Sequence, residues 1–151
     1  MTAIEPATEP WGPAPDGLDL PHWEGLVEGE LRLQRCNACR AWIWGPQAIC
    51  GSCHGFDIGW EKVEPAGTVY SWHRSWYPYM DEYAGRLPYV TVLVELPGAD
   101  GRRVLGLLVD DIDEDPRIGD EVVGAIELDE GARWPLVRWC RVRAGSEGET
   151  R

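Results

Sequence analysis

Lysine is nearly absent from the sequence, and the basic residues as a whole are outnumbered. Of 151 residues, 14 are Lys or Arg and 26 are Asp or Glu, which gives a formal net charge of −12. The single lysine is Lys62. Proteins that bind nucleic acids neutralise phosphates with Lys and Arg, so this composition argues against a nucleic-acid partner.

Long apolar runs are missing as well. The chain has no stretch of about eighteen apolar residues, so the sequence predicts no transmembrane helix and no membrane partner. The first residues, MTAIEPATEPWGPAPDG, have neither a basic start nor an apolar core and do not resemble a signal peptide. We therefore expect a cytoplasmic protein, in which cysteines stay reduced.

The common catalytic signatures are also lacking. There is no GxSxG, Walker loop, GxGxxG or HExxH motif, and the histidines His22, His54 and His73 are far apart. Cys140 has no neighbouring His to activate it and is expected to be a small buried hydrophobic residue. The acidic stretch 110–115 lacks the spacing of an EF-hand loop and is expected to be a solvated link. We expect no turnover from this chain alone.

What the sequence does contain, after residue 65, is a series of β-strand patterns. Alternating, β-branched and aromatic residues predict strands at 67–77, 88–97, 102–110, 120–128 and 133–143. The link between the third and fourth strands has room for a turn of helix, and Gly106 suits a sharply coiled strand. This order favours an OB-type barrel, which is a small Greek-key barrel, although an SH3-like barrel would also have five short strands.

A short helix is expected before the strands. Asp19 can cap it, Pro21 fits its first turn and Gly29 can stop it. The fold class is therefore mainly β, with an N-terminal short helix and a four-cysteine ribbon followed by a five-stranded OB-fold barrel. The expected parts are a flexible lead (1–17), the helix and ribbon (18–64), the OB-fold domain (65–144) and a frayed tail (145–151).

Four of the five cysteines form two Cys-x-x-Cys pairs within RCNACRAWIWGPQAICGSCHGF: Cys36 with Cys39, and Cys50 with Cys53. Two tight turns that each present two thiolates can close a tetrahedral Zn²⁺ site. A cytosolic chain would not keep two structural disulfides, and a thioredoxin-like dithiol needs a βαβ unit. An iron site of rubredoxin type uses the same ligands and stays open. Because four cysteines complete the shell, we expect a structural and not a catalytic metal.

The two turns differ in their glycines. Gly51 and Gly55 are expected to help the second turn adopt its tight backbone. The first turn has no glycine after Cys39, so Arg40 must tolerate that geometry. His54 follows the fourth cysteine and is expected to lie beside the completed shell or to be exposed.

Nine tryptophans are the other peculiarity, and the segment 71–89 is the richest in large aromatic rings. Such rings either pack over the mouth of the barrel or form a contact surface for a partner or an apolar acyl group. The candidate contact residues are Trp42, Trp44, Trp72, His73, Trp76, Tyr77, Tyr79, Met80, Tyr83 and Tyr89.

The order of HWEGLVEGELRLQRC, CNAC…CGSC, GTVYSW, PYVTVLVEL, VLGLLVD and RIGDEV resembles the family of rubredoxin-like zinc-ribbon plus acyl-CoA-associated OB-fold proteins. The resemblance covers roughly residues 20–143, and the sequence departs from the family in lacking a glycine after Cys39 and in its many tryptophans. It implies an accessory partner of thiolase-like enzymes. In some members the partner is a lipid-transfer-type aldolase that cleaves steroid side chains.

From this resemblance we expect a hetero-oligomer, in which ribbon and helix dock on the partner and the aromatic segment helps to shape an acyl-CoA channel. The alternative is a stand-alone module that binds or delivers acyl-CoA. Its CoA phosphates would contact Arg32, Arg35, Arg40 and Lys62, or Arg138, Arg141 and Arg143. A third interpretation, an OB-fold nucleic-acid binder, is opposed by the net charge.

Overall fold

The computed structural model describes residues 11–144; the first ten residues and the expected tail at 145–151 lie outside the described residues. The chain forms two compact units. Among the described residues, one unit combines 11–63 with 126–136, and the other combines 64–125 with 137–144. None of the described helices is long and apolar enough to cross a membrane.

The first unit begins with helix α1 (Leu20–Val27), as the sequence predicts. Pro21 lies in its first turn, and Gly29 follows its end with a φ of +80°. Asp19 precedes the helix, but its side chain does not cap it. Its carboxylate instead accepts hydrogen bonds from Ala14 N (2.7 Å) and Trp23 Nε1 (3.0 Å). Asp19 therefore fixes the approach to the helix and the indole of its first turn.

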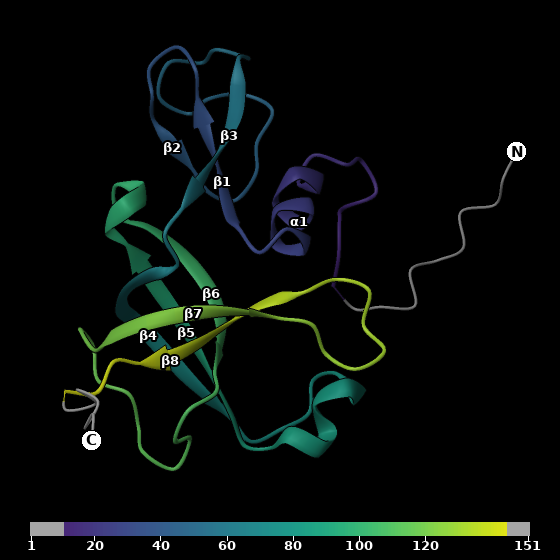
Figure 1. The fold of residues 1–151 in the computed structure, drawn as a ribbon, viewed down its shortest axis with the longest axis vertical. Helices are drawn as coiled ribbons and strands as arrows, with labels where there is room; N and C mark the ends of the chain where they lie inside the picture. Colours follow the sequence, from purple (N-terminus) through teal and green to yellow (C-terminus); the bar gives the residue numbers. More distant parts are fainter. Residues whose placement is uncertain (1–10, 145–151) are drawn as a thin grey trace, which may run out of the picture. The chain divides into compact units, whose positions relative to one another are not determined.

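The ribbon follows as a three-stranded antiparallel sheet in the order β2-β1-β3 (Figure 1). Its strands are β1 (Leu31–Cys36), β2 (Trp42–Ile43) and β3 (Ile58–Val63). Gln34 is buried in β1, where its amide donates to Gln47 O (3.1 Å) and accepts from Gln47 N (2.7 Å). This reciprocal pair satisfies a buried amide and holds the loop that leads to the second cysteine pair.

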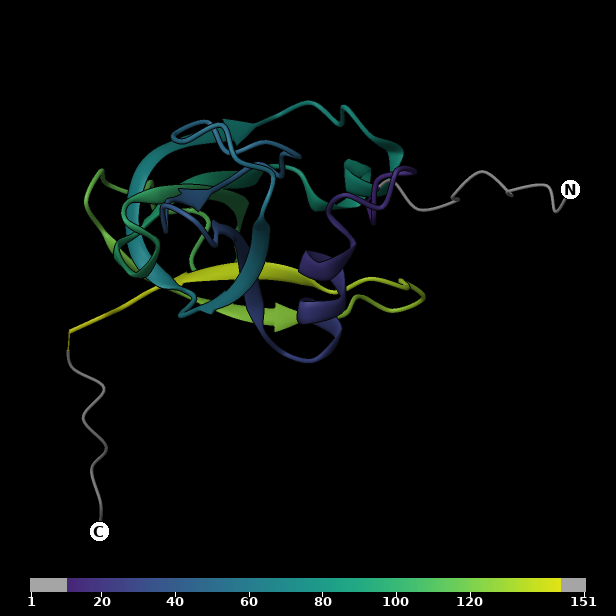
Figure 2. The same ribbon diagram turned by 90° about the horizontal axis from the view of Figure 1, so that it is seen from above.

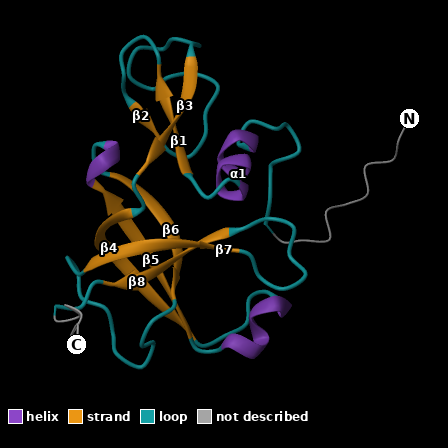
Figure 3. Ribbon diagram, in the orientation of Figure 1, coloured by secondary structure: helices purple, strands orange, loops and turns teal. Residues whose placement is uncertain are grey.

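The second fold element is a closed barrel of five strands in the order β4-β5-β6-β8-β7. The strands are β4 (Ala66–Ser75), β5 (Tyr89–Leu96), β6 (Arg102–Leu108), β7 (Glu121–Glu127) and β8 (Leu136–Arg141). Neighbours β4–β5, β5–β6 and β4–β7 are antiparallel, whereas β6 and β8 are parallel. Strands dominate the secondary structure (Figure 3), and the predicted mainly β, OB-like fold is confirmed.

Two features of the strands allow the barrel to close: buried and exposed side chains alternate along them, and β4 is bent. Along β5, every second residue from Val90 to Leu96 is fully buried, as expected for a strand with one face in the core. Strand β4 carries a register shift between Val69 and Ser71, and it curves strongly in the view of Figure 2. A Cβ on Gly67 would lie 2.0 Å from Glu95 O, so only glycine permits this close approach of β4 to β5.

The prediction of a helical turn between the third and fourth barrel strands is wrong. In the described part of the chain, the 3₁₀ helices are η1 (Asp81–Arg86), after β4, and η2 (Pro97–Ala99), after β5. The link at 109–120 consists of turns and bends. The side chain of Arg141 donates to two carbonyl groups of the link, those of Asp111 and Glu114, in place of helical hydrogen bonds.

Candidate functional site

Each Cys-x-x-Cys turn, here called a knuckle, closes with the same backbone hydrogen bond. In the first knuckle, Arg40 N donates to Cys36 O (3.0 Å); in the second, His54 N donates to Cys50 O (2.9 Å). The first cysteine of each pair is buried and the second is exposed. The two knuckles are therefore equivalent in backbone, as a site built from two halves requires.

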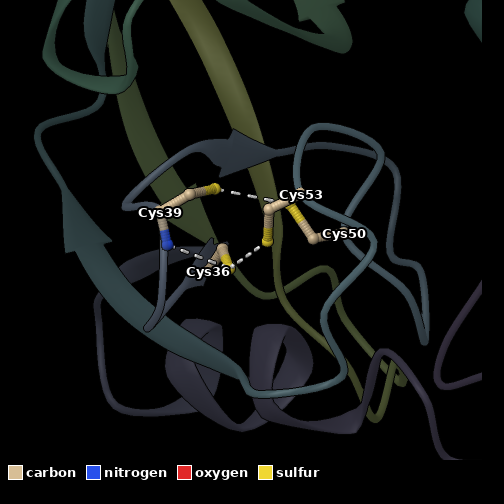
Figure 4. Close-up of side chains that lie close together, drawn as sticks. All are labelled: Cys36, Cys39, Cys50 and Cys53. Atoms are coloured by element: carbon tan, nitrogen blue, oxygen red, sulfur yellow. Dashed lines mark hydrogen bonds between the residues drawn. The ribbon is translucent and has the colours of Figure 1, made fainter.

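The four sulfurs converge on one point, as Figure 4 shows. All four Sγ atoms lie within 4.8 Å of one another, and two of the separations are 3.6 Å (Cys36 to Cys53) and 3.7 Å (Cys39 to Cys50). A tetrahedral Zn²⁺ with Zn–S bonds of about 2.3 Å requires sulfurs about 3.8 Å apart. The thiols thus fit one metal ion, and the four predicted ligands are brought together.

The pKa values of the cysteine thiols are also consistent with a bound cation. Backbone N–H groups of Cys53 and Ser52 lower the pKa of Cys50 to about 6. The N–H of Gly55 also lowers the pKa of Cys53, but hydrogen bonds with the sulfurs of Cys36 and Cys39 outweigh it and raise that pKa to about 11. So many sulfurs cannot all ionise at neutral pH unless a cation compensates their charge.

Left-handed backbone conformations occur at both knuckles, and neither falls on a glycine. Arg40 has a φ of +64° and His54 a φ of +60°. The prediction that Arg40 must tolerate the geometry is confirmed. The second knuckle uses His54 in this role, and not Gly51 or Gly55, which lie outside the left-handed region. Each such residue costs about 1–2 kcal/mol relative to glycine.

Trp42 and Trp44, which flank Ile43 in the ribbon, belong to its own packing. Trp42 is only 8% exposed and lies under the guanidinium of Arg35, 4.5 Å from the ring centroid. Trp44 packs on His22 of α1, with ring centroids 4.7 Å apart. His22 Nδ1 donates to Arg32 O (3.0 Å), and burial lowers the pKa of His22 below its usual value despite that bond and the nearby Asp19. The helix is thus fixed to the ribbon through His22.

In the aromatic segment 71–89, the rings that directly follow β4 face solvent. Trp76, Tyr77 and Tyr79 are 72%, 66% and 74% exposed, and the rings of Tyr77 and Tyr79 meet edge to face at 5.2 Å. The remaining candidates in the segment are Trp72, Met80, Tyr83 and Tyr89, which are half-buried, and His73, which is exposed. The ring of Tyr83 packs on that of Tyr89, with centroids 5.0 Å apart.

The candidate cations of the ribbon are mostly engaged with carboxylates. Arg32 bonds Glu28 and Glu30, while Arg35 and Arg40 both bond Glu61. The two arginines hold the pKa of Glu61 below its usual value. Lys62 is exposed.

On the last strand, Arg141 is clamped to Asp110. Its Nε and Nη2 donate to the two carboxylate oxygens of Asp110 (3.0 Å each), and other N–H groups bond the carbonyls of Asp111 and Glu114. Burial alone would raise the pKa of Asp110, but these bonds keep it below its usual value. Arg143 lies near Asp111 (3.9 Å) and Glu114 (3.7 Å). The acidic link is therefore anchored at its start, and only its outer carboxylates are solvated.

A cavity of about 330 Å³ adjoins this clamp. Its lining is of mixed charge: Glu114, Arg117, Asp120, Glu121, Arg141, Val142, Arg143 and Ala144. Because the acidic and basic side chains balance, the cavity does not favour ions of either sign. Arg138, the third candidate on this strand, is buried.

Sequence reasoning missed Phe56 and the pair Tyr70–Arg103. Phe56 is a largely exposed ring directly after the second knuckle. Arg103 lies over the ring of Tyr70 at 3.5 Å and bonds Glu95 (3.0 Å). The sequence shows that Phe56 follows the second knuckle, but it does not show that the ring is exposed, because exposure depends on contacts with distant segments.

Two family models match consecutive parts of the chain. Residues 23–59 match the rubredoxin-like zinc ribbon domain of ChsH2, and residues 60–123 match the C-terminal OB-fold domain of ChsH2. The zinc assignment of the first model and the sulfur geometry together support a structural Zn²⁺.

Solved structures show the same architecture. A chain of the Ltp2-ChsH2(DUF35) aldolase has a TM-score of 0.75 and 28% identity, and the match covers 86% of this chain and 98% of that one. A protein of unknown function from the DUF35 family of Sulfolobus solfataricus has a TM-score of 0.55 and 18% identity, covering 86% and 87% of the two chains. The latter similarity supports the fold alone.

Among curated proteins, the probable enoyl-CoA hydratase alpha subunit of Thermomonospora curvata is 35% identical over 119 residues. The match covers 77% of this chain but 35% of the relative, so the chain spans about a third of the length of that protein. The two adjoining family models, matched in order along the chain, show that it belongs to the ChsH2 family of zinc-ribbon and OB-fold proteins.

Proposed function

We propose that this chain is an accessory subunit that docks on a thiolase-like acyl-CoA enzyme and supports its activity. The observation that carries the proposal is the similarity to a chain of the Ltp2-ChsH2(DUF35) aldolase, which extends over 98% of that chain. Because the match includes ribbon and barrel together, the whole architecture of a subunit from an aldolase complex is present here.

The supported reaction is then a retro-aldol cleavage of a C–C bond in an acyl-CoA, with a steroid side chain as the bulky acyl group. The relative from an aldolase supports the aldol chemistry, and the relative described as a subunit of a probable enoyl-CoA hydratase supports a CoA thioester as the substrate class. The metal centre of this chain contributes rigidity, since its four cysteines leave no open coordination position for a substrate. The reacting groups belong to the partner.

The aromatic segment is the proposed contact with the partner and its acyl-CoA channel. Three neighbouring side chains, Trp76, Tyr77 and Tyr79, are each about two-thirds or more exposed, which is unusual for rings of this size. Trp and Tyr dominate the energetically important centres of protein interfaces. Ribbon and helix α1 provide the second docking element.

The charges favour docking over a stand-alone CoA-binding module. Arg32, Arg35 and Arg40 are already bonded to Glu28, Glu30 and Glu61, and Arg141 to Asp110. A CoA phosphate would have to displace a carboxylate at each of these positions. Calorimetry of the chain alone with CoA and acyl-CoAs distinguishes the two functions, because the accessory subunit binds neither tightly without its partner.

The decisive experiment is reconstitution. The thiolase-like subunit is assayed for retro-aldol cleavage of an acyl-CoA alone, with the wild-type chain, and with a variant in which Trp76, Tyr77 and Tyr79 are replaced by Ala. We expect activity with the wild-type chain only. Leu105→Ala, at a similarly exposed apolar residue of β6, is the matched control and should support full activity. Turnover by the chain alone, or full activity with the triple variant, would contradict the proposal.

A further inference from the structure

Arg40 occupies a backbone position at which glycine would be easier to accommodate. It follows Cys39 with a φ of +64°, in the left-handed region that an L side chain adopts only at a cost in free energy. The backbone hydrogen bond from Arg40 N to Cys36 O could be made by any residue other than proline. The knuckle therefore explains the backbone conformation at this position, but it does not explain why the side chain is that of an arginine.

The ion pair inside the ribbon does not explain the guanidinium either. Glu61 already accepts a hydrogen bond from Arg35 Nη1 (3.0 Å), and Arg35 is further fixed by donation from its Nε to Arg40 O (2.9 Å). The Arg35 side chain is 27% exposed, whereas that of Arg40 is 50% exposed. Arg40 Nη2 bonds the other oxygen of Glu61. Two guanidinium groups thus share one carboxylate, and Arg40 is the outer one.

Charge is also distributed unevenly along the chain. Residues 20–63 contain five acidic and four basic side chains, so these side chains contribute only −1 of the total of −12. Four thiolates with one Zn²⁺ add −2 to this segment, so the attraction of an acidic partner depends on where its arginines lie and not on the net charge of the segment. Arg35 and Arg40 flank the cysteines of the first knuckle and share one carboxylate, so this pair has one positive charge in excess.

We propose that Arg40 is a recognition residue for the partner: its guanidinium binds a carboxylate side chain on the thiolase-like subunit. This inference rests on the proposed accessory function and assigns one contact in it. Arg40 uses one Nη2 hydrogen for Glu61, and its remaining N–H groups can form the paired bonds that a carboxylate accepts. Two guanidinium groups that share Glu61 leave one surplus positive charge, which matches a single carboxylate better than the several charges of the CoA phosphates. The hydrogen bond to Glu61 orients the guanidinium, and the rigid metal knuckle fixes the backbone of Arg40.

The test compares Arg40→Gly with two matched controls in the zinc-loaded full chain. His54→Gly relieves the same backbone conformation at the second knuckle, and Lys62→Ala removes one exposed positive charge from the same ribbon. Affinity for the immobilised, separately purified thiolase-like subunit is measured at low and high salt. We expect a loss of about 10- to 100-fold for Arg40→Gly, a smaller salt dependence than in the wild type, and at most about a twofold change for either control.

The stability of the same variants separates recognition from structure. Arg40→Gly should keep its zinc and unfold no more easily than the wild type, because glycine suits the left-handed position. Wild-type affinity in Arg40→Gly would overturn the inference, as would a loss of zinc or of thermal stability in parallel with binding. If the wild-type chain does not bind the thiolase-like subunit, the proposed function fails, and this contact fails with it. If the wild-type chain binds and Arg40→Gly binds equally well, only the contact at Arg40 fails.

Discussion

A Cβ atom on Gly106 would lie 2.7 Å from Nε1 of Trp139, so these two residues share one place in the barrel core. Gly106 on β6 pairs with Val92, which points inward, and Trp139 on β8 fills the space that a side chain there would need. The indole is fully buried, and its N–H has no hydrogen-bond partner in the described part of the chain. Gly106 is thus required for the packing of the tryptophan, and not merely for the coiling of its strand.

The first prediction follows from this shared space. Gly106→Ala should destabilise the protein by about 1–3 kcal/mol, the usual cost of overpacking a core. In a Trp139→Phe background the same substitution should cost much less, because the smaller ring leaves the methyl group its space. Urea unfolding of the wild type, the two single variants and the double variant measures the coupling. Additive effects of the two substitutions would show that the residues do not compete.

The metal centre gives a second prediction. Serine at Cys36, Cys39, Cys50 or Cys53 should abolish binding of one Zn²⁺ per chain and unfold the ribbon, since structural zinc contributes about 10–16 kcal/mol of apparent folding free energy in small domains. Metal analysis and near-UV circular dichroism report the loss. Cys140→Ser is the control and should retain the metal. A cysteine variant with a full complement of zinc and a native spectrum would refute the structural role.

The clamp between Arg141 and Asp110 should be important for stability. Both side chains are largely buried, so Arg141→Ala leaves a carboxylate without its counter-charge and should cost about 3 kcal/mol. The pKa of Asp110 is lowered in the folded state. The stabilisation is therefore present above the unfolded value of about 3.9 and is lost as the pH falls through the folded pKa. Chemical denaturation at pH 7 and at pH 3 checks both statements; equal costs at the two pH values would contradict them.

His22 should make the docking of helix α1 sensitive to mild acid. Burial lowers its folded-state pKa, so the unfolded chain takes up a proton more readily than the folded one. The stability that the neutral ring provides is complete above about pH 6.5 and is lost as the pH falls through the lower folded value. His22→Gln, which can still donate to Arg32 O, should flatten this dependence. Thermal unfolding between pH 5 and 8 measures it; unchanged slopes would exclude His22 as the source.

The sequence by itself determined the ligands and the strands. The spacing of Cys36, Cys39, Cys50 and Cys53 is a short-range property, and each pair can meet a metal without help from the rest of the chain. Strand positions were predicted within a few residues, because alternation of apolar residues is also local. Local patterns do not predict a conformation that depends on a residue far along the chain. In the link before β7, hydrogen bonds from Arg141 replace the expected turn of helix.

Only the tertiary structure decided which aromatic and charged side chains are available to a partner. Trp42 and Trp76 look alike in sequence, yet one is covered by Arg35 and the other faces solvent. Arg35 and Arg40 look alike too, but only their shared contact with Glu61 from β3 makes Arg40 the outer cation. Exposure and pairing depend on residues brought together from distant parts of the chain, and composition and spacing do not contain that information.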